Sequence, residues 1–277
     1  MPINGVPTFI KWAGGKKQLL KSFRKFFPTR IDRYLEPFVG SGAVFFYIKE
    51  HYSLEEVILS DINDELINAF NVVKDHLESL IGVLKEHKKN HSTEYYYKIR
   101  SLDPSALSNI ERAARFLYLN KTCYNGLYRV NSKGKFNVPI GRYKNPKIVD
   151  EEVLQKASML LQDVTIKHQS FEKVLEDAHE RDFVYLDPPY YPLSKTSSFT
   201  GYTKEVFMEK EQEKLAEVYS KLDKKGCLVM LSNSDTEFIH LLYGENGYDI
   251  RKVKARRAIN SKADRRGEIN EVVILNY

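Results

Sequence analysis

The chain has little cysteine and no long apolar run, and both absences limit what it can be. Its two cysteines among 277 residues, Cys123 and Cys227, lie far apart and without the spacing of metal ligands. A disulfide framework and a zinc site are therefore excluded. No apolar stretch approaches the ~18 residues of a membrane span, and residues 1–7 lack the charged start and apolar core of a secretion signal. We expect a cytoplasmic protein that needs neither metal nor membrane.

Acidic residues are fewer than basic ones, which favours an anionic partner without identifying it. There are 43 Lys and Arg against 37 Asp and Glu, a net charge of +6. The length suits one large domain with an insertion.

The most informative segment is Asp187-Pro188-Pro189-Tyr190, which follows the apolar run at 183–186. An exocyclic amino group on a base is a poor nucleophile because its lone pair is delocalised into the ring. If the Asp187 carboxylate and the Pro188 carbonyl each accept one of its N–H bonds, the lone pair is freed to attack a methyl sulfonium. The prolines make the turn stiff, and the ring face of Tyr190 can stack on a base drawn from the duplex. Taken alone, the segment also fits a simple proline turn.

A glycine turn, Gly40-Ser41-Gly42, follows a short strand expected from Tyr34 onward. Asp61 lies 21 residues after Gly40, at the end of the next expected strand, where a carboxylate can bind the two hydroxyls of a ribose. A dinucleotide site would need a third glycine where Phe45 stands. The pattern therefore favours a nucleoside without a pyrophosphate, such as S-adenosylmethionine, over a structural turn with a solvated carboxylate.

The segment 11–16 contains two glycines but is not a phosphate loop, which would need Gly in place of Ile10 and Ser or Thr in place of Lys17. The glycines beside Trp12 and Lys16 can instead close over a cofactor, with Lys16 meeting a carboxylate. An N-terminal turn around a buried Trp is the alternative.

Residues 120–147 carry seven basic side chains and no acidic one, interleaved with aromatic residues. A β-hairpin or extended loop is expected here, with a turn at 131–134. Arg, Asn and Tyr side chains in such a loop suit phosphate contacts, base-edge hydrogen bonds and wedging between bases, although a solvated face is the plain alternative. A second basic stretch, 251–266, either lines the same groove or is a solvated loop.

The alternation of strands and helices predicts an α/β fold interrupted by a mostly helical insertion. The expected domains are a catalytic, cofactor-binding one at 1–63 and 163–277 and a DNA-recognition one at 64–162. Outside the insertion we expect helices at 43–50 and 204–222, and strands at 34–39, 57–60, 164–167, 183–186, 227–231, 248–253 and 271–275.

Neither cysteine follows a proline, so the Pro-Cys pair that offers a thiolate for methylation at a ring carbon of cytosine is absent. We interpret both as packing residues.

These motifs, in this order, closely resemble the Dam-type DNA adenine-N6 methyltransferases that modify GATC, including the Dpn-type modification methylases. Cofactor motifs stand before the recognition region and the catalytic tetrapeptide after it, which is that family's alpha arrangement. The small departures include Tyr128 and Ile140. The resemblance extends nearly from end to end and is carried by the segments 9–16, 36–42, 61–63, 124–129, 136–143, 187–190 and 231–234.

The resemblance implies roles for individual residues. Asp187, Pro188 and Tyr190 are the expected catalytic residues. The expected cofactor-binding residues are Trp12, Gly14, Lys16, Glu36, Phe38, Gly40, Gly42, Asp61, Ile62 and again Asp187. The positions that match readers or wedges of GATC are Lys11, Tyr124, Asn125, Leu127, Arg129 and Pro139, to which the basic segment adds Lys133, Lys135, Arg142 and Tyr143 as DNA-binding residues.

The resulting expectation is a Rossmann-like methyltransferase sheet with an inserted, mostly helical DNA-recognition domain that carries a β-hairpin. The enzyme would flip adenine out of double-stranded DNA and methylate N6 directly from S-adenosyl-L-methionine, without a metal or a covalent intermediate. A restriction endonuclease acting on the same site would be a functional partner without direct contact. Two alternatives stay open: methylation of cytosine N4 or protein glutamine, whose enzymes favour Ser or Asn at position 187, and a catalytically silent DNA-binding protein.

Overall fold

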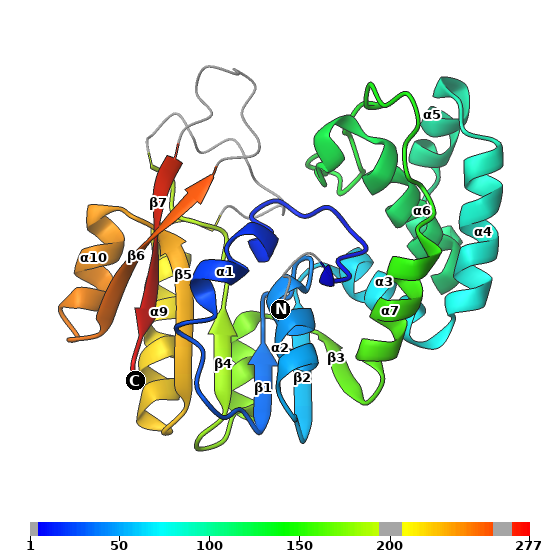
Figure 1. The fold of residues 1–277 in the computed structure, drawn as a ribbon. Coiled ribbons are helices and arrows are strands. Elements are labelled where there is room, and N and C mark those ends of the chain that lie inside the picture. Colours follow the sequence, from blue (N-terminus) through cyan, green and yellow to red (C-terminus); the bar gives the residue numbers. More distant parts are fainter. Residues whose placement is uncertain (1–4, 194–206, 257–267) are drawn as a thin grey trace.

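A mixed seven-stranded sheet forms the centre of the computed structural model, which describes residues 5–193, 207–256 and 268–277 (Figure 1). The strand order is β3-β2-β1-β4-β5-β7-β6, and only β7 runs against the other strands. The strands are β1 (Arg33–Glu36), β2 (Glu56–Asp61), β3 (Val164–His168), β4 (Phe183–Leu186), β5 (Leu228–Ser234), β6 (Asp249–Arg256) and β7 (Glu268–Leu275).

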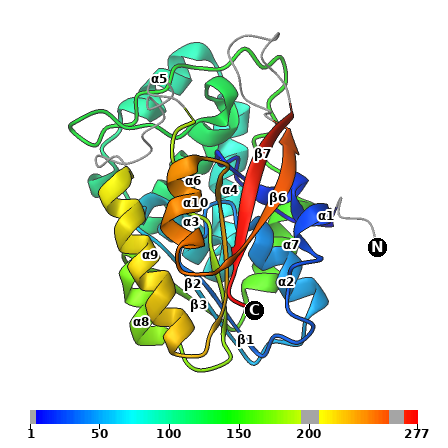
Figure 2. The ribbon, with the colours of Figure 1, turned by 90° about the vertical axis from the view of Figure 1, so that its left-hand side faces the viewer.

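Helices cover both faces of this sheet, as Figure 2 shows. Alternate side chains of each strand point to opposite faces, so the apolar residues divide into two clusters. One cluster packs the sheet against α1 (Leu20–Phe23), α2 (Ala43–His51) and the helices of the insertion. The other packs it against α8 (Val174–Asp177), α9 (Glu209–Lys224) and α10 (Glu237–Gly244). The α/β fold expected from the sequence is confirmed.

The insertion between β2 and β3 is helical, as expected. It consists of α3 (Asp64–Asp75), α4 (Leu77–Lys89), α5 (Thr93–Ser101), α6 (Asn109–Thr122) and α7 (Glu151–Leu161). Side-chain caps begin three of these helices: Asn63 accepts from the Leu66 amide, Ser92 from the Tyr95 amide, and Ser108 forms a capping box with Glu111.

The insertion shares one apolar core with the sheet. Phe70 of α3 stacks on Phe46 of α2, with ring centroids 6.5 Å apart, and meets Phe9 edge-on at 4.9 Å. These rings belong to the same buried cluster as Tyr185 of β4. Displacing the insertion would therefore expose apolar surface of the sheet.

The basic segment after α6 forms an extended loop, the second of the two alternatives expected there. The chain reverses at the predicted turn, where the Gly134 amide donates to the Asn131 carbonyl at 2.8 Å. Its flanks form only isolated bridges, between Val130 and Phe136 and between Cys123 and Ile140. The β-hairpin in our expected fold is therefore reduced to a turn closed by one antiparallel bridge, with the Asn131 amide bonded to the Lys135 carbonyl and the Asn137 amide to the Arg129 carbonyl, and no regular two-stranded ladder extends from it.

Two other helices, α9 and α10, differ from the sequence prediction. The helix expected at 204–222 begins later, at Glu209 after the extended Met208, and ends at Lys224; residues 204–206 lie outside the described part of the chain. Helix α10 was not predicted; it is short, and its clearest sequence signal is Thr236, which accepts from the Ile239 amide.

A buried asparagine joins the N-terminal segment to the basic loop. Asn120 of α6 accepts from the Lys11 amide at 2.8 Å and donates to the carbonyls of Lys11 and Gly126 at 2.7 and 3.2 Å. Lys11 and Gly126, from segments far apart in the sequence, are thus bonded to one side chain. Within the described residues, no helix combines the length and apolar character needed to cross a bilayer.

Candidate active site and DNA interface

Strand alternation gathers polar side chains on one face of the sheet, at the edge where the parallel strands end. Glu36 ends β1, Asp187 follows β4, Ser232 lies near the end of β5, and Glu271 lies opposite that end on the antiparallel β7. In each strand, residues of the same parity pack in the cluster that faces α2 and the insertion. The carboxyl edge of a parallel sheet is the usual place for a ligand site in such folds.

Asp187 is held by an ammonium and a hydroxyl. The Lys16 ammonium lies 2.6 Å from Oδ1 and 2.7 Å from Oδ2, and it also donates to the Gly14 carbonyl at 2.7 Å. Ser232 donates to Oδ1 at 2.8 Å, and its oxygen lies 3.0 Å from the Tyr185 hydroxyl. Burial raises the pKa of Asp187 above its ordinary value, and Lys16 opposes that rise. These contacts fix the carboxylate in one orientation.

The Tyr190 ring lies beside Asp187 and is held by two charged groups. The Lys16 ammonium is 4.6 Å from the ring centroid. The Tyr190 hydroxyl donates to Glu271 Oε2 at 2.8 Å. The structure therefore brings the expected catalytic aspartate and tyrosine together with one of the expected cofactor residues.

Two buried amides hold the turn that carries these groups. Gln212 of α9 donates to the Pro189 carbonyl at 3.0 Å and accepts from the Asn233 amide group at 3.0 Å. Asn233 in turn accepts from the Tyr191 amide at 3.1 Å. We did not single out Gln212 from the sequence, and nothing in its surroundings there marks it. Asn233 lies in the segment 231–234 that carried part of the resemblance.

Asp61 forms a second polar centre, at the end of β2. It accepts from the Gly40 amide at 3.3 Å and from the Asn63 amide at 3.0 Å. Burial raises the pKa of Asp61 to about 6. Gly40 and Gly42 have left-handed backbones, with φ of +48° and +68°, so the turn needs glycine at both positions.

Trp12 packs directly on this glycine turn. A Cβ placed on Gly40 would lie 2.8 Å from Trp12 Cδ1. Ile62, beside Asp61, is 56% exposed. A carboxylate, a glycine backbone and an indole are thus adjacent, with an exposed aliphatic residue next to the carboxylate in the chain.

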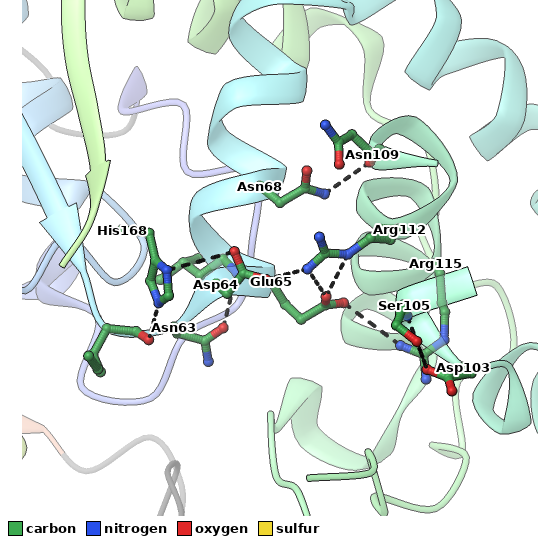
Figure 3. Close-up of polar contacts among 12 residues, drawn as sticks. Asn63, Asp64, Glu65, Asn68, Asp103, Ser105, Asn109, Arg112, Arg115 and His168 are labelled. Carbon is green, nitrogen blue, oxygen red and sulfur yellow. Dashed lines mark hydrogen bonds and ion pairs between the residues drawn. The ribbon is translucent and has the colours of Figure 1, made fainter. Parts of the chain in front are cut away.

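Two residues from neighbouring elements, His168 and Arg112, anchor the turn at Asp61 from both sides, as Figure 3 shows. His168 at the end of β3 lies 3.0 Å from the Ile62 carbonyl through Nε2. On the other side, Arg112 of α6 bonds both Asp64 and Glu65 at the start of α3. The turn is therefore bound to the neighbouring strand and to the insertion.

The remaining predicted cofactor residues have structural partners of their own. Glu36 is buried and accepts from the Tyr34 hydroxyl at 2.8 Å; burial raises its pKa well above the ordinary value. Phe38 stacks on Phe171 with centroids 5.3 Å apart and meets Phe207 edge-on.

Except for Lys11, the predicted DNA-binding residues lie on one segment, and most of them are exposed. Leu127 is half-buried, whereas the exposed members are Lys11, Tyr124, Asn125, Arg129, Lys133, Lys135, Pro139, Arg142 and Tyr143. The Lys11 ammonium lies 3.3 Å from the Tyr143 hydroxyl and 4.4 Å from the ring centroid, so the N-terminal segment joins the loop surface. Of the second basic stretch, residues 257–266 lie outside the described chain, and Arg251 and Lys252 are paired with Asp249 and Asp235.

Arg129 is held by a residue to which we assigned no role from the sequence, although it lies in the segment 136–143 that carried part of the resemblance. Asn137, across the loop, accepts from Arg129 Nε at 2.7 Å. Arg129 Nη2 also donates to the Asn137 carbonyl at 3.5 Å, so two bonds to Asn137 hold the guanidinium.

Tyr128 connects the cofactor centre to the loop. It stacks on Trp12, with centroids 5.7 Å apart and planes inclined by 27°. Its hydroxyl is hydrogen-bonded by Asn63, and burial raises the pKa of Tyr128 to about 12. Tyr128, where the chain departs from the pattern of the resembled family, thus connects the proposed cofactor centre with the loop.

The comparison with known proteins identifies the family. A model of the D12 class N6 adenine-specific DNA methyltransferases matches residues 12–259. The chain belongs to this family. It is 47% identical to the type II methyltransferase M.MjaIII of Methanocaldococcus jannaschii, over 98% of this chain and 99% of that protein. It is 44% identical to the type II methyltransferase M1.LlaDCHI of Lactococcus lactis (97% and 95%) and 35% identical to the DNA adenine methylase of Escherichia coli K12 (97% and 94%).

The chain is therefore an adenine-specific DNA methyltransferase, and DNA is its substrate.

A hollow of about 470 Å³ lies at the opposite end of the sheet, between residues 29–32 and 51–55. It is remote from Asp187 and Asp61, so we assign it no part in the chemistry. The described residues contain no cluster of three or more potential metal ligands.

The contact between Gly40 and Trp12 can be tested directly. We expect Gly40→Ala to displace the indole and to lower stability by roughly 1–2 kcal/mol, because alanine is strained at this φ and its methyl group meets Trp12. Trp12 is the single tryptophan, so its emission reports the displacement. Gly82→Ala is the control, since a Cβ there meets nothing within 4 Å. Unchanged emission in Gly40→Ala would contradict the packing.

Proposed function

We propose that this methyltransferase transfers the methyl group of S-adenosyl-L-methionine to N6 of adenine in double-stranded DNA, within GATC, after flipping the adenine out of the helix. The observation that carries the proposal is the Asp187 carboxylate, fixed beside the Tyr190 ring at the end of β4. Together they offer a hydrogen-bond acceptor and a stacking face to a single base.

The centre at Asp61 suits the cofactor. A carboxylate held by two backbone amides, Gly40 and Asn63, can accept from two ribose hydroxyls. The bare Gly40 backbone admits Trp12 at close range, and exposed Ile62 offers an apolar surface for an adenine ring. Asp61, Trp12 and Ile62 would hold the nucleoside, with Lys16 near its carboxylate. When bound, the cofactor supplies a methyl group on a sulfonium.

The chemistry that this chain supplies is activation of the amino group. The Asp187 carboxylate and the Pro188 carbonyl each accept a hydrogen bond from one N–H group of N6, which draws the nitrogen toward sp³ geometry. Once N6 carries the methyl group, its surplus proton passes to the Asp187 carboxylate. Gln212 binds the carbonyl of Pro189 and not that of Pro188. The stiff turn thus presents the acceptor pair as one unit.

We assign DNA recognition to residues 64–162. Their loop carries Arg129, Tyr124 and the lysines at 133 and 135 on one exposed surface. Two relatives are a DNA adenine methylase and a type II methyltransferase, which supports adenine as the target base. The proposal includes a restriction endonuclease that acts on the same site without direct contact. A cytoplasmic location fits such a role.

The test is single-turnover methylation of a GATC duplex followed by sequencing that reports base and position. We expect Asp187→Ala to abolish methyl transfer. DNA affinity should be largely retained, because the proposed contacts with DNA are made by the basic loop at 120–147. Asp182→Ala, a carboxylate bonded to Arg33 in another part of the fold, controls for loss of a buried charge. Transfer by Asp187→Ala at the wild-type rate, or product at cytosine, would overturn the assignment.

Arg129 should read a guanine of the site. An arginine fork matches the O6 and N7 acceptors of guanine, so Arg129→Ala should lose discrimination at one G·C pair worth about 1–3 kcal/mol. Lys133→Ala should instead weaken binding to all sequences and reduce its salt dependence. Competition binding with GATC and single-substituted duplexes separates the two effects. An equal loss on every duplex would make Arg129 a phosphate contact.

Cofactor affinity should fall in mild acid. With the pKa of Asp61 raised to about 6 by burial, the carboxyl group is ionised at neutral pH and protonated below pH 6, where it can accept fewer hydroxyl hydrogens. Calorimetry with S-adenosylhomocysteine should show constant affinity above about pH 7 and about tenfold weaker binding at pH 5. Asp61→Asn should bind weakly without this slope, and His168→Gln should keep it. A flat wild-type profile would remove Asp61 from the site.

A further inference from the structure

The hydroxyl of Tyr190 has a partner on a distant strand. It donates to Glu271 Oε2 at 2.8 Å, across 81 residues of sequence. The Tyr190 side chain starts from the stiff turn after β4, whereas Glu271 belongs to β7. Our sequence interpretation used only the ring face of Tyr190, and this bond gives the other end of the ring a fixed position.

The backbone that carries Glu271 is paired on both sides. Glu271 lies opposite Ser234 of β5 and Val253 of β6. Its neighbour Val272 packs on the face that meets α9 and α10, so alternation directs Glu271 to the face that holds Asp187. A half-buried carboxylate on a doubly paired strand is a well-fixed acceptor.

We propose that Glu271 is a positioning residue for the target adenine, acting through Tyr190. The proposal rests on the proposed role of Tyr190 as the stacking face. The hydroxyl oxygen lies on the axis of the Cβ–Cγ bond, so a bond to it fixes where the ring lies, while the Lys16 ammonium over the ring limits rotation about that axis. A carboxylate acceptor makes the bond charge-assisted and short. We do not expect the affinity of the loop for DNA to depend on this bond.

The experiment compares Glu271→Ala, Glu271→Gln, Tyr190→Phe and the Tyr190→Phe/Glu271→Ala double variant. We expect Glu271→Ala and Tyr190→Phe each to slow single-turnover methylation of a GATC duplex about tenfold, with DNA affinity unchanged. The double variant should be no slower than the slower single one, because both remove the same bond. Glu271→Gln should keep most of the rate, since an amide oxygen can accept from the hydroxyl. 2-Aminopurine at the target position should be less quenched in the slow variants, because its stacking on the ring is lost.

Tyr191 provides a matched control. Its hydroxyl also donates to a carboxylate at 2.8 Å, that of Glu209, but its ring packs on Phe238. Tyr191→Phe and Glu209→Ala should leave the methylation rate and the 2-aminopurine signal unchanged.

Three results would overturn the proposal: a normal rate in Glu271→Ala, additive effects in the double variant, or Glu271→Gln as slow as Glu271→Ala. Tyr190→Ala separates this proposal from the proposed function. If Tyr190→Ala is slow and Glu271→Ala is not, only the positioning role fails. If Tyr190→Ala transfers normally, the stacking role of Tyr190 fails as well.

Discussion

The ion pair between Lys16 and Asp187 fixes the geometry on which the active site depends. It joins the N-terminal segment to the end of β4 across 171 residues of sequence, with Lys16 almost fully buried and Asp187 18% exposed. Such a pair gains little net free energy over apolar packing, because both charges lose water, but removing one partner leaves a buried charge uncompensated. The pair therefore specifies an arrangement more than it stabilises the fold. In that arrangement one ammonium contacts both oxygens of the acceptor carboxylate and the face of Tyr190.

Because Lys16 is fixed, the residues before it are fixed as well, and they serve all three parts of the enzyme. Trp12 packs on the glycine turn beside Asp61 and stacks on Tyr128. Lys11 is bonded through its backbone to Asn120 and reaches Tyr143. Lys11, Trp12 and Lys16 of this segment thus contact the loop, the proposed cofactor centre and the acceptor carboxylate, respectively, so single contacts link the three centres.

The sequence was sufficient to predict where Asp61 and Asp187 lie, but not to predict the residues that hold the site in place. Asp61 and Asp187 could be placed because each follows an apolar strand, and parallel strands end at the same edge of a sheet. Ser232, Gln212 and Glu271 could not be placed with them, since their contacts depend on pairing between elements tens of residues apart. Asn137 was invisible for a related reason: the flank of an irregular loop has no periodicity from which to infer that its amide faces Arg129. The same irregularity made the β-hairpin prediction wrong in detail, while the turn within it was correct.

Charge is distributed unevenly between the basic loop at 120–147 and the sheet. Residues 120–147 carry seven cations and no carboxylate, more than the net charge of +6 of the whole chain. The attraction to DNA is therefore concentrated on one loop, where most cations are exposed and strongly screened by salt. Arg129 differs, because Asn137 holds its guanidinium and reduces the entropy lost when it meets a base. In the proposed function, the loop combines exposed cations suited to encounter with one preorganised cation suited to reading sequence, and the sheet holds the carboxylates for the chemistry.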